Sequence, residues 1–443
     1  MKRRKFLRTV GSLAVAAAMP PYIRDLALRR KPNVLLIVSD DLGYGDTSIT
    51  GRKDYTTPVI DQLAREGVLL TDAYSSAPVC TPTRVAMNTG RYAARYQAGL
   101  YEPLTTQAIG LSPNPATFAR LMKNGGYDTA LVGKWHLGTR PQFHPLLHGY
   151  DEFYGFLGPG ADYTSHVDVE VRDTSFFQDG TTPVKTRGYL TDLFTERSIQ
   201  FISRKRSRPF FLNLEYNAPH WPYQAAGDPP YPDSMQMSAG GSSATYARMV
   251  KSMDDGIGRI LQTLHTKGLE RDTLVIFTSD NGGEHYAYMG PFTKGKMTVW
   301  EGGIRVMAAA RWPGVIKAGT RSNQTCATFD YTATLVKLAG QHADATVPFD
   351  GIDIMPQLKG SASVSRDLYW RLFQRQQGKA VRSGEWKYLQ DKSGEYLFHL
   401  ADDPGEKHDM KTAQPQRFAQ LKEKMARWEA QMLAPIPLKE SER

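Results

Sequence analysis

Two pairs of oxygen-bearing side chains stand at the ends of two strongly apolar runs. Asp40 and Asp41 follow the run VLLIV, and Asp280 and Asn281 follow the run TLVIFT. Continuous apolar runs are typical of strands buried on both faces of a parallel sheet, and α/β proteins place ligands at the carboxyl ends of such strands. Three carboxylates and an amide make a hard, all-oxygen site that suits Ca²⁺ or Mg²⁺ and not Zn²⁺. Adjacent acids also cap helices and solvate loops, but two such pairs at strand ends favour a metal site.

A cysteine occurs in a context that favours an anion site. Cys80 precedes Pro82, a residue suited to the first turn of a helix, in the segment CTPTR. Free amides and the helix dipole at such a terminus favour an anion, and the guanidinium of Arg84 could hold an oxyanion from the same turn. A lone cysteine is more often a small buried apolar residue, so the cysteine by itself leaves both interpretations open.

Two further segments carry groups that could complete such a site. Lys134 and His136 flank an aromatic residue, so both can face the same side of an extended segment. His220 lies in a loop with prolines on both sides (APHWPY), after an apolar strand candidate at 209–214. Single lysines and histidines are usually surface or core polar residues. These positions therefore indicate a functional site only in combination with the acidic pairs and Cys80.

The segment from Cys80 to Arg84 resembles the Cys-x-Pro-x-Arg signature of the type I sulfatases. This family belongs to the alkaline-phosphatase superfamily and includes arylsulfatases and N-acetylgalactosamine-6-sulfatases. Other segments resemble the family in the same order along the chain: 32–45 (PNVLLIVSDDLGYG), 133–138 (GKWHLG), 218–223 (APHWPY), 279–283 (SDNGG), 296–305 (KMTVWEGGIR) and 382–409. The resemblance spans about residues 32 to 410 and is specific for the family but only weakly specific for a substrate.

The resemblance implies a modified nucleophile and a metal ion. In this family a maturating enzyme oxidises the cysteine to formylglycine, and a hydroxyl of the hydrated aldehyde, activated here by Asp280, attacks sulfur. One Ca²⁺ per chain is expected, and its implied ligands are Asp40, Asp41, Cys80, Asp280 and Asn281.

The resemblance also assigns roles to basic residues. Arg84 and Lys134 would neutralise sulfate oxygens, and Lys134 and His136 would bind the hydroxyls at position 80. His136 would then promote breakdown of the covalent intermediate, and His220 would protonate the leaving oxygen.

A further lysine is expected to bind sulfate. In the family this lysine lies five positions before the Glu of a Glu-Gly-Gly segment. Glu301 therefore points to Lys296, with Lys294 as the alternative.

The expected activity is that of a sulfuric ester hydrolase acting on an aryl or carbohydrate sulfate. The alternative is a phosphodiester or phosphonate monoester hydrolase of the same superfamily, and a binding protein with an inactive enzyme fold is a third, remote reading. The segments 92–110 and 162–187 are expected to contact the leaving group. Aromatic residues that could stack on it are Tyr101, Tyr163, His166 and Trp221.

The elements that must position these residues alternate between strand and helix. Helices are expected from Thr57-Pro58 to Gly67, from Asn114-Pro115 to Gly125, and over 245–267. This alternation predicts an α/β catalytic domain over residues 31–362, with a large mixed or parallel sheet sandwiched by helices, as in alkaline phosphatase. Four short strand candidates and a helix near 414–432 predict a small antiparallel sheet plus helix over 363–443.

The first 30 residues are expected to be a signal and linker. Arg3 and Arg4 precede a short, Ala-rich, weakly apolar stretch, which resembles a twin-arginine export signal. The twin-arginine export machinery is therefore an expected partner, and the expected location is periplasmic or secreted. No run of 18 apolar residues occurs, so no stable membrane insertion is expected.

Charge and cysteine content exclude some classes of protein. The 443 residues include 55 Lys and Arg and 45 Asp and Glu, and five of the ten excess positive charges lie between Lys2 and Arg8. The remaining excess is mild, which suits an anionic substrate and not a nucleic-acid surface. Cys80 and Cys326 are the only cysteines, which excludes a disulfide scaffold.

Overall fold

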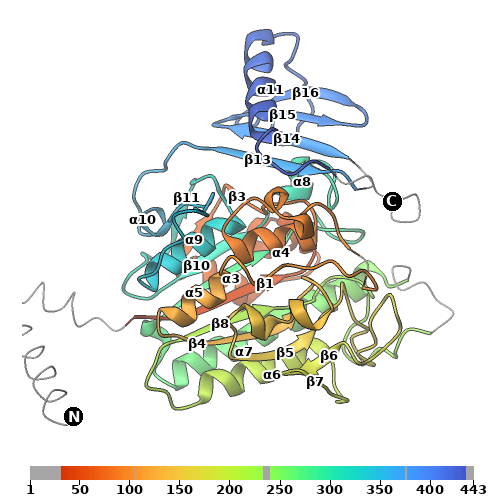
Figure 1. Cartoon of the computed structure of the whole chain (residues 1–443), viewed down its shortest axis with the longest axis vertical. Coiled ribbons are helices and arrows are strands. Elements are labelled where there is room, and N and C mark those ends of the chain that lie inside the picture. The colour runs from red at the N-terminus through yellow and green to blue at the C-terminus, as the bar shows by residue number, and fades with distance from the viewer. Residues whose placement is uncertain (1–30, 104, 233–239, 375–376, 436–443) are drawn as a thin grey trace, which may run out of the picture. The chain divides into compact units, whose positions relative to one another are not determined.

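A ten-stranded mixed sheet organises the larger part of the structure (Figure 1). The computed structural model describes residues 31–103, 105–232, 240–374 and 377–435, so the expected signal segment lies outside the described residues. The strand order is β11-β2-β10-β9-β1-β8-β4-β5-β6-β7. The five central strands run parallel: β9 (Thr273–Ser279), β1 (Asn33–Ser39), β8 (Phe210–Glu215), β4 (Asp128–Lys134) and β5 (Glu152–Phe156).

Shorter strands extend this sheet at both edges. Antiparallel β10 joins β9 to β2, β11 pairs parallel with β2, and β6 and β7 continue antiparallel from β5. Their bounds are β2 (Val68–Leu70), β6 (Phe177–Asp179), β7 (Thr182–Pro183), β10 (Ala308–Arg311) and β11 (Thr320–Ser322). A separate pair consists of β3 (Ala73–Tyr74) and β12 (Cys326–Ala327).

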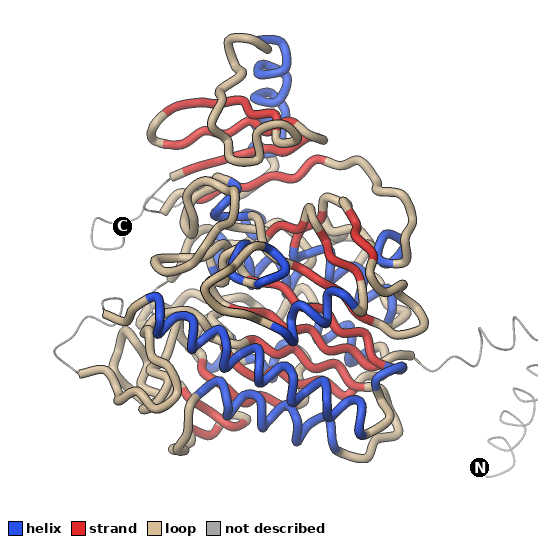
Figure 2. The backbone as a smooth tube through the Cα atoms, turned by 180° about the vertical axis from the view of Figure 1, so that it is seen from behind, coloured by secondary structure: helices blue, strands red, loops and turns tan. Residues whose placement is uncertain are grey.

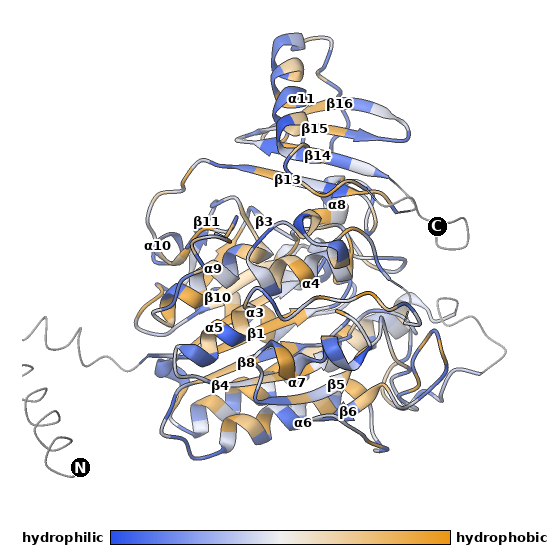
Figure 3. Ribbon diagram, in the orientation of Figure 1, coloured by the Kyte–Doolittle hydropathy of each residue, from blue (hydrophilic) through white to orange (hydrophobic). Residues whose placement is uncertain are grey.

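Helices cover both faces of the large sheet (Figure 2). Alternate residues of β1 pack into two different hydrophobic clusters, Val34, Leu36 and Val38 into one and Leu35 and Ile37 into the other, and all five are fully buried. The first cluster includes side chains of α4 (Cys80–Thr89), α5 (Phe118–Asn124) and α9 (Thr328–Leu338), and the second those of α3 (Pro58–Arg65), α6 (Leu190–Ser203) and α7 (Ser243–Thr266). Figure 3 shows hydrophobic colour along strands of the large sheet, as expected for strands that are buried on both faces. The predicted sandwich is confirmed.

One expected helix boundary is wrong. The helix placed at Asn114-Pro115 begins at Phe118. The backbone is still extended at Thr117, whose hydroxyl donates a hydrogen bond to the carbonyl of His148 at 2.6 Å. A tertiary contact therefore holds these residues out of the helix.

The N-terminus of α3 is capped by a side chain from another helix. Thr57 makes no side-chain cap, and the free amides of Val59 and Ile60 donate to the carboxylate of Asp254 in α7, at 3.1 and 2.8 Å. Asp254 is fully buried. This contact fixes α3 against α7 on one face of the sheet.

The capping carboxylate predicts a pH effect on stability. Burial raises the pKa of Asp254 from 3.8 to about 6. The native state therefore holds this proton more tightly than the unfolded chain, so this group lowers the free energy of unfolding as the pH rises from about 4 to about 6. We expect Asp254→Asn to remove up to about 3 kcal/mol of this pH dependence. Urea denaturation of both proteins across this range measures it, and parallel pH profiles would refute the assignment.

The C-terminal part forms a four-stranded antiparallel sheet with a helix packed on it, which confirms the second predicted architecture (Figure 1). Its elements are β13 (Asp367–Leu372), β14 (Gly378–Ser383), β15 (Trp386–Asp391), β16 (Gly394–His399) and α11 (Pro415–Glu429). The boundary at 362/363 between catalytic and C-terminal domains stays a prediction. From Asn33 onward the described chain forms one compact unit.

Buried polar contacts join the small sheet to the catalytic part. The Nζ of Lys387 in β15 lies 2.9 Å from Glu301 and 2.8 Å from Glu406, and all three side chains are almost completely buried. Glu301 begins the short helix α8 (Glu301–Ile304), and a second short helix, α10 (Met355–Leu358), precedes β13. Because α8 follows the segment that carries Lys296, this ion-pair network supports one wall of the candidate site. None of the helices in the described part of the chain has the length and hydrophobicity needed to cross a membrane.

Candidate functional site

Four neighbouring strands deliver polar residues to one edge of the sheet. The carboxyl ends of β9, β1, β8 and β4 are adjacent in the strand order. The buried side chains found there are Asp280 and Asn281 after β9, Asp40 and Asp41 after β1, Glu215 at the end of β8, and Lys134 at the end of β4. The parallel sheet thus brings together residues that lie up to 240 positions apart in the sequence.

Cys80 is the first residue of α4 and faces this edge. Its side chain is fully buried, and its Sγ lies 3.3 Å from Oδ1 of Asp40 and 4.0 Å from Oδ1 of Asp41. Burial, with the nearby charges of Asp280 and Asp40, raises the pKa of the Cys80 thiol well above 9. The unmodified residue is therefore a thiol, and a thiol is a poor nucleophile.

The guanidinium of Arg84 binds carboxylates of the site and is not directed to solvent. Its guanidinium donates at 2.8 Å to Glu215 through Nη1 and at 2.8 Å to Asp280 through Nη2, and its side chain is 1% exposed. Nη2 also lies 3.8 Å from Asp40. This geometry favours a role in holding the acids in place over the expected direct contact with a sulfate oxygen.

Glu215 is a site residue that the sequence reasoning missed. Burial raises its pKa to about 7, although the charge of Arg84 opposes this effect. The same signal that identified Asp40 and Asp280, a polar residue ending an apolar strand, was available in the run FFLNLE.

Two lysines contact the acids of the site. Nζ of Lys134 lies 2.7 Å from Oδ2 of Asp40, and Nζ of Lys296 lies 2.8 Å from Oδ2 of Asp41. Lys294 instead pairs with Asp391 at 3.2 Å and lies over the ring of Trp300, and 42% of its side chain is exposed. Of the two expected alternatives, the structure brings Lys296 to the site and directs Lys294 away from it.

Two buried histidines complete the surroundings of Cys80. Nδ1 of His220 is hydrogen-bonded to the carbonyl of Trp221, and its Nε2 lies 3.6 Å from Asp41. Because a carbonyl only accepts, Nδ1 carries the hydrogen, and Nε2 is the atom free to exchange a proton. Burial, assisted by the positive charges of neighbouring lysines, lowers the pKa of both His220 and His136 well below 6.5.

Strained backbone concentrates at the site. Asp41, His136 and Met297, which follows Lys296, adopt left-handed φ values of 63°, 54° and 68°. Such conformations are uncommon for residues with side chains and persist where surrounding contacts hold them. For His136 these contacts include its amide, which donates to Leu157 at 3.2 Å, and its carbonyl, which accepts from Thr81 at 3.1 Å.

The charges of the site fit a divalent cation. Four carboxylates, of Asp40, Asp41, Asp280 and Glu215, face three cationic side chains, of Arg84, Lys134 and Lys296. Counted as ionised, these groups leave one excess negative charge, and the nearby carboxylates of Glu102 and Glu284 add to it. This negative charge would repel an anionic substrate. A divalent cation would offset this negative charge and so favour binding of a sulfate monoester. Oδ1 of Asn281 is also buried without a hydrogen-bond partner among the described residues, as a metal-ligand oxygen would be.

Most of the aromatic residues expected to stack on the substrate are buried. Tyr163 is fully buried and donates its hydroxyl to the carbonyls of Asn217 and His220, and 4% of His166 is exposed, so neither can stack on a substrate. Trp221 is partly exposed and lies against the ring of His220, with centroids 4.8 Å apart. Tyr101 is also buried, with 6% of the residue exposed, so Trp221 is the best placed of the four.

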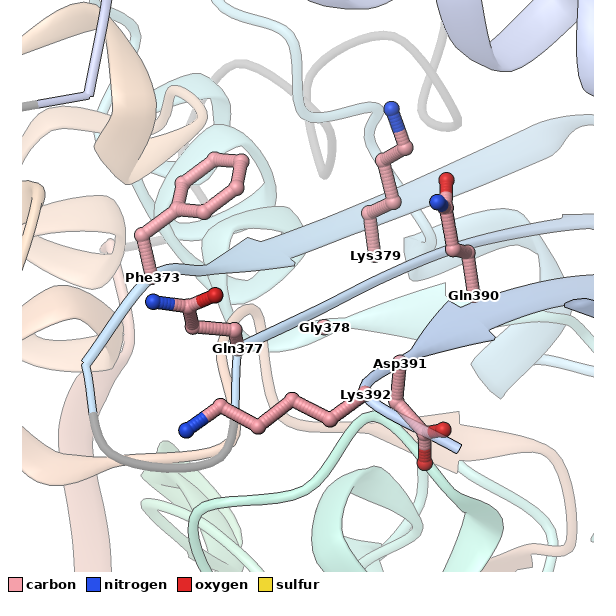
Figure 4. Close-up of a pocket in the computed structure, with 7 residues that line it drawn as sticks. All are labelled: Phe373, Gln377, Gly378, Lys379, Gln390, Asp391 and Lys392. Atoms are coloured by element: carbon pink, nitrogen blue, oxygen red, sulfur yellow. The ribbon is translucent and has the colours of Figure 1, made fainter. Parts of the chain in front are cut away.

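A small cavity lies on the C-terminal sheet (Figure 4). Its volume is about 160 Å³, and it is lined by Phe373, Gln377, Gly378, Lys379, Gln390, Asp391 and Lys392. Asp391 also binds Lys294. The cavity therefore adjoins the segment that leads to Lys296. Lys379, Gln390 and Asp391 in its lining are engaged with other protein groups, so the cavity is not assigned a second site.

Known proteins are similar to this chain in both sequence and fold. The profile of the sulfatase family matches residues 32–341. The chain is 34% identical over 389 residues to N-acetylgalactosamine-6-sulfatase of Mus musculus, covering 82% of this chain and 71% of the relative. It is 34% identical over 424 residues to steryl-sulfatase of Mus musculus, covering 76% and 66%.

Solved structures agree with this result. The crystal structure of Ps i-CgsB in complex with k-i-k-neocarrahexaose superposes with a TM-score of 0.84 at 31% identity, covering 92% of this chain and 94% of that one. PsFucS1 sulfatase from Pseudoalteromonas sp. superposes with a TM-score of 0.75 at 27% identity, covering 92% and 91%. The chain therefore belongs to the sulfatase family, within the alkaline-phosphatase superfamily, and is a sulfuric ester hydrolase.

Proposed function

We propose that this enzyme hydrolyses the sulfate ester of a carbohydrate, using formylglycine formed from Cys80 and one Ca²⁺ ion. The observation that carries the proposal is the position of Cys80. It is buried at a helix N-terminus, in the family signature, 3.3 Å from one proposed metal ligand and among two lysines and two histidines. A thiol at this point could serve neither as a hard metal ligand nor as an efficient nucleophile.

The modification and the metal supply chemistry that the twenty ordinary side chains lack. Hydrated formylglycine provides a hydroxyl nucleophile and a second hydroxyl through which sulfate can be released. Ca²⁺, held by Asp40, Asp41, Asp280, Asn281 and residue 80, would supply positive charge to the nucleophile and to a sulfate oxygen.

The charged residues of the chain bind and orient. We assign Arg84 to holding Asp280 and Glu215, so that Asp280 faces residue 80 as the acceptor of the nucleophile's proton. Lys134 and Lys296 each contact a proposed metal ligand. Neutralisation of those acids by a cation would leave both ammonium groups able to bind sulfate oxygens.

The two histidines serve different proton transfers. We assign Nε2 of His220 to protonating the leaving oxygen. A bound sulfate anion opposes the lysine charges that lower the pKa of His220, which favours the protonated ring in the complex. His136 accepts a proton from the second hydroxyl at position 80, and sulfate departs. The overall reaction consumes one water and yields an alcohol and sulfate.

The metal assignment predicts the calcium content of the purified enzyme. We expect elemental analysis to find about one calcium per chain, because the donor set is hard and oxygen-rich. Asp40→Ala should lower both the calcium content and the melting temperature, since it removes a ligand and leaves buried Lys134 without its partner. Glu284→Gln is the matched control, because Glu284 lies 3.6 Å from Lys296 outside the proposed ligand set and should retain calcium. Two zinc ions and no calcium would contradict the assignment.

We propose a sulfated sugar as the substrate. One similar protein is named an N-acetylgalactosamine-6-sulfatase, and a similar structure was solved with k-i-k-neocarrahexaose. Trp221, partly exposed beside His220, is the aromatic surface that we assign to the sugar ring.

We also propose that the enzyme is matured and then exported. Its expected twin-arginine signal belongs to a route that carries folded proteins, so a sulfatase-maturating enzyme could modify Cys80 before export to the periplasm or beyond. Fractionation of cells with and without the twin-arginine system tests this, and an unchanged location in cells that lack it would exclude this route.

A substrate panel tests the proposed function. Purified enzyme is incubated with sulfated mono- and oligosaccharides, a nitrophenyl sulfate and the matching phosphate and phosphonate esters, and inorganic sulfate and phosphate are measured. Release of sulfate from a sugar, with much slower attack on the phosphorus esters, supports the proposal. Faster hydrolysis of a phosphonate or phosphodiester would support the alternative activity instead.

A further inference from the structure

His136 has a ring nitrogen whose hydrogen-bonding partner is missing. Nδ1 is buried and makes no hydrogen bond to any described residue, and only 6% of the side chain is exposed. The hydrogen bonds between His136 and the described residues hold its main chain, and none of them fixes which ring nitrogen carries the hydrogen. A buried nitrogen without a partner is costly, and a base needs a fixed tautomer to present one defined nitrogen.

The nearest carboxylate to this nitrogen belongs to Glu102. Its Oε1 lies 3.9 Å from Nδ1 of His136, beyond hydrogen-bond distance but within reach of a small side-chain rotation. Ligand atoms of Cys80, Glu102 and His136 all lie within 4.8 Å of one another, so this carboxylate is at the reaction centre. Glu102 lies in none of the segments that resemble the family.

The backbone of Glu102 is hydrogen-bonded to a residue that follows the first strand of the C-terminal sheet. Its amide donates to Oε1 of Gln374 at 2.8 Å, and its carbonyl accepts from Nε2 of the same side chain at 3.4 Å. Gln374 lies two residues beyond the end of β13, next to Phe373 of the cavity in Figure 4. Nearby, Thr105 contacts Asp168 and Thr139 donates to the Thr105 carbonyl. The segment is therefore anchored on two sides and presents Glu102 to His136.

We propose that Glu102 is a positioning residue that accepts a hydrogen bond from Nδ1–H of His136 and thereby leaves Nε2 as the base. This inference rests on the proposed function of His136. The environment supports the pairing, because His136 is surrounded by the positive charges of Lys134, Arg84 and Lys296. When His136 accepts a proton, a facing carboxylate offsets the repulsion from those cations, as in other His–carboxylate pairs. In this way Gln374 connects the C-terminal sheet to the catalytic base.

The tautomer of His136 tests the proposal without reference to activity. Enzyme labelled with ¹⁵N-histidine is studied by long-range ¹H–¹⁵N spectra, and His136 is assigned from the spectrum of His136→Gln. The expected wild-type pattern is a protonated Nδ1 and a bare Nε2. Glu102→Ala should give a mixture of tautomers, and Gln374→Ala a smaller change in the same direction. Glu284→Gln, which removes a comparable charge beside Lys296, should keep the wild-type pattern. An unchanged tautomer in Glu102→Ala would overturn the proposal.

Kinetics provides a second readout. Because His136 acts after the leaving group has departed, Glu102→Ala should lower kcat about tenfold or more while kcat/KM for an aryl sulfate stays nearly constant. Sulfate bound to residue 80 should accumulate in quenched samples. Glu102→Asp should recover part of kcat. Equal losses in kcat and kcat/KM, with no bound sulfate, would contradict the proposal. Wild-type enzyme that released no sulfate at all would instead refute the proposed function, while the spectra would still test the pairing.

Discussion

Replacement of Cys80 by alanine is expected to lower kcat by about 10⁴-fold or more. Alanine has no sulfur or oxygen on Cβ at which a maturating enzyme could oxidise it to an aldehyde, so the nucleophile and its route for releasing sulfate are lost together. Release of sulfate from a nitrophenyl ester measures the effect. Cys80→Ser is informative as well, because it should be active only in cells whose maturating enzyme accepts serine.

Cys326 offers the matched control for this substitution. It is the other cysteine and is equally buried, but it belongs to β12 and contributes to no catalytic contact described above. Cys326→Ala should keep nearly all activity and lose at most about 1–2 kcal/mol of stability from the small cavity. Similar activity losses in both variants would show that packing, and not chemistry, explains the effect at Cys80.

Replacement of His220 by alanine is expected to discriminate between leaving groups. An alkoxide leaving from a sugar has a high pKa and needs a proton, whereas nitrophenolate leaves readily without one. We expect kcat/KM to fall about 10²- to 10⁴-fold for the sugar sulfate and far less for the nitrophenyl sulfate. Equal losses for the two esters would contradict the general-acid role and reassign His220 to holding a sulfate oxygen beside Lys296.

His136→Ala is the comparison variant for this experiment. His136 acts in the later step, so its loss should lower kcat for both esters alike and allow sulfate bound at residue 80 to accumulate. His220 is thus assigned to the first chemical step and His136 to the later one, although both lie close to residue 80. A leaving-group dependence in His136→Ala would show that this separation is wrong.

The polar residues at the strand ends were predictable because each follows an apolar run that is recognisable in the sequence. Asp40 and Asp280 each end an apolar run, and parallel strands in one sheet necessarily bring such ends together. The same rule would have found Glu215. The C-terminal sheet was predictable from four short strand candidates separated by turn residues, and its register is local in sequence.

Other features depend on contacts between distant segments and leave no local pattern. Whether Arg84 faces sulfate or acids depends on Glu215, which lies 131 residues away. Lys294 and Lys296 are two residues apart, and the left-handed backbone at Lys294 and Met297 helps to decide which one enters the site. Glu102 is brought to His136 partly by Gln374, 272 residues along the chain. Spacing in the sequence contains no information about the Arg84–Glu215 and Glu102–Gln374 pairs, whereas the spacing of Lys296 from Glu301 did indicate which lysine enters the site.

The most direct test of the account is the mass of the tryptic peptide that spans residues 66–84 of the active enzyme. We predict that residue 80 is formylglycine, so the peptide is lighter than its cysteine form by the difference in mass between H₂S and one oxygen atom. The fraction of converted peptide should rise in proportion to sulfatase activity across preparations. Full activity in a preparation whose peptide contains only unmodified cysteine would contradict the account.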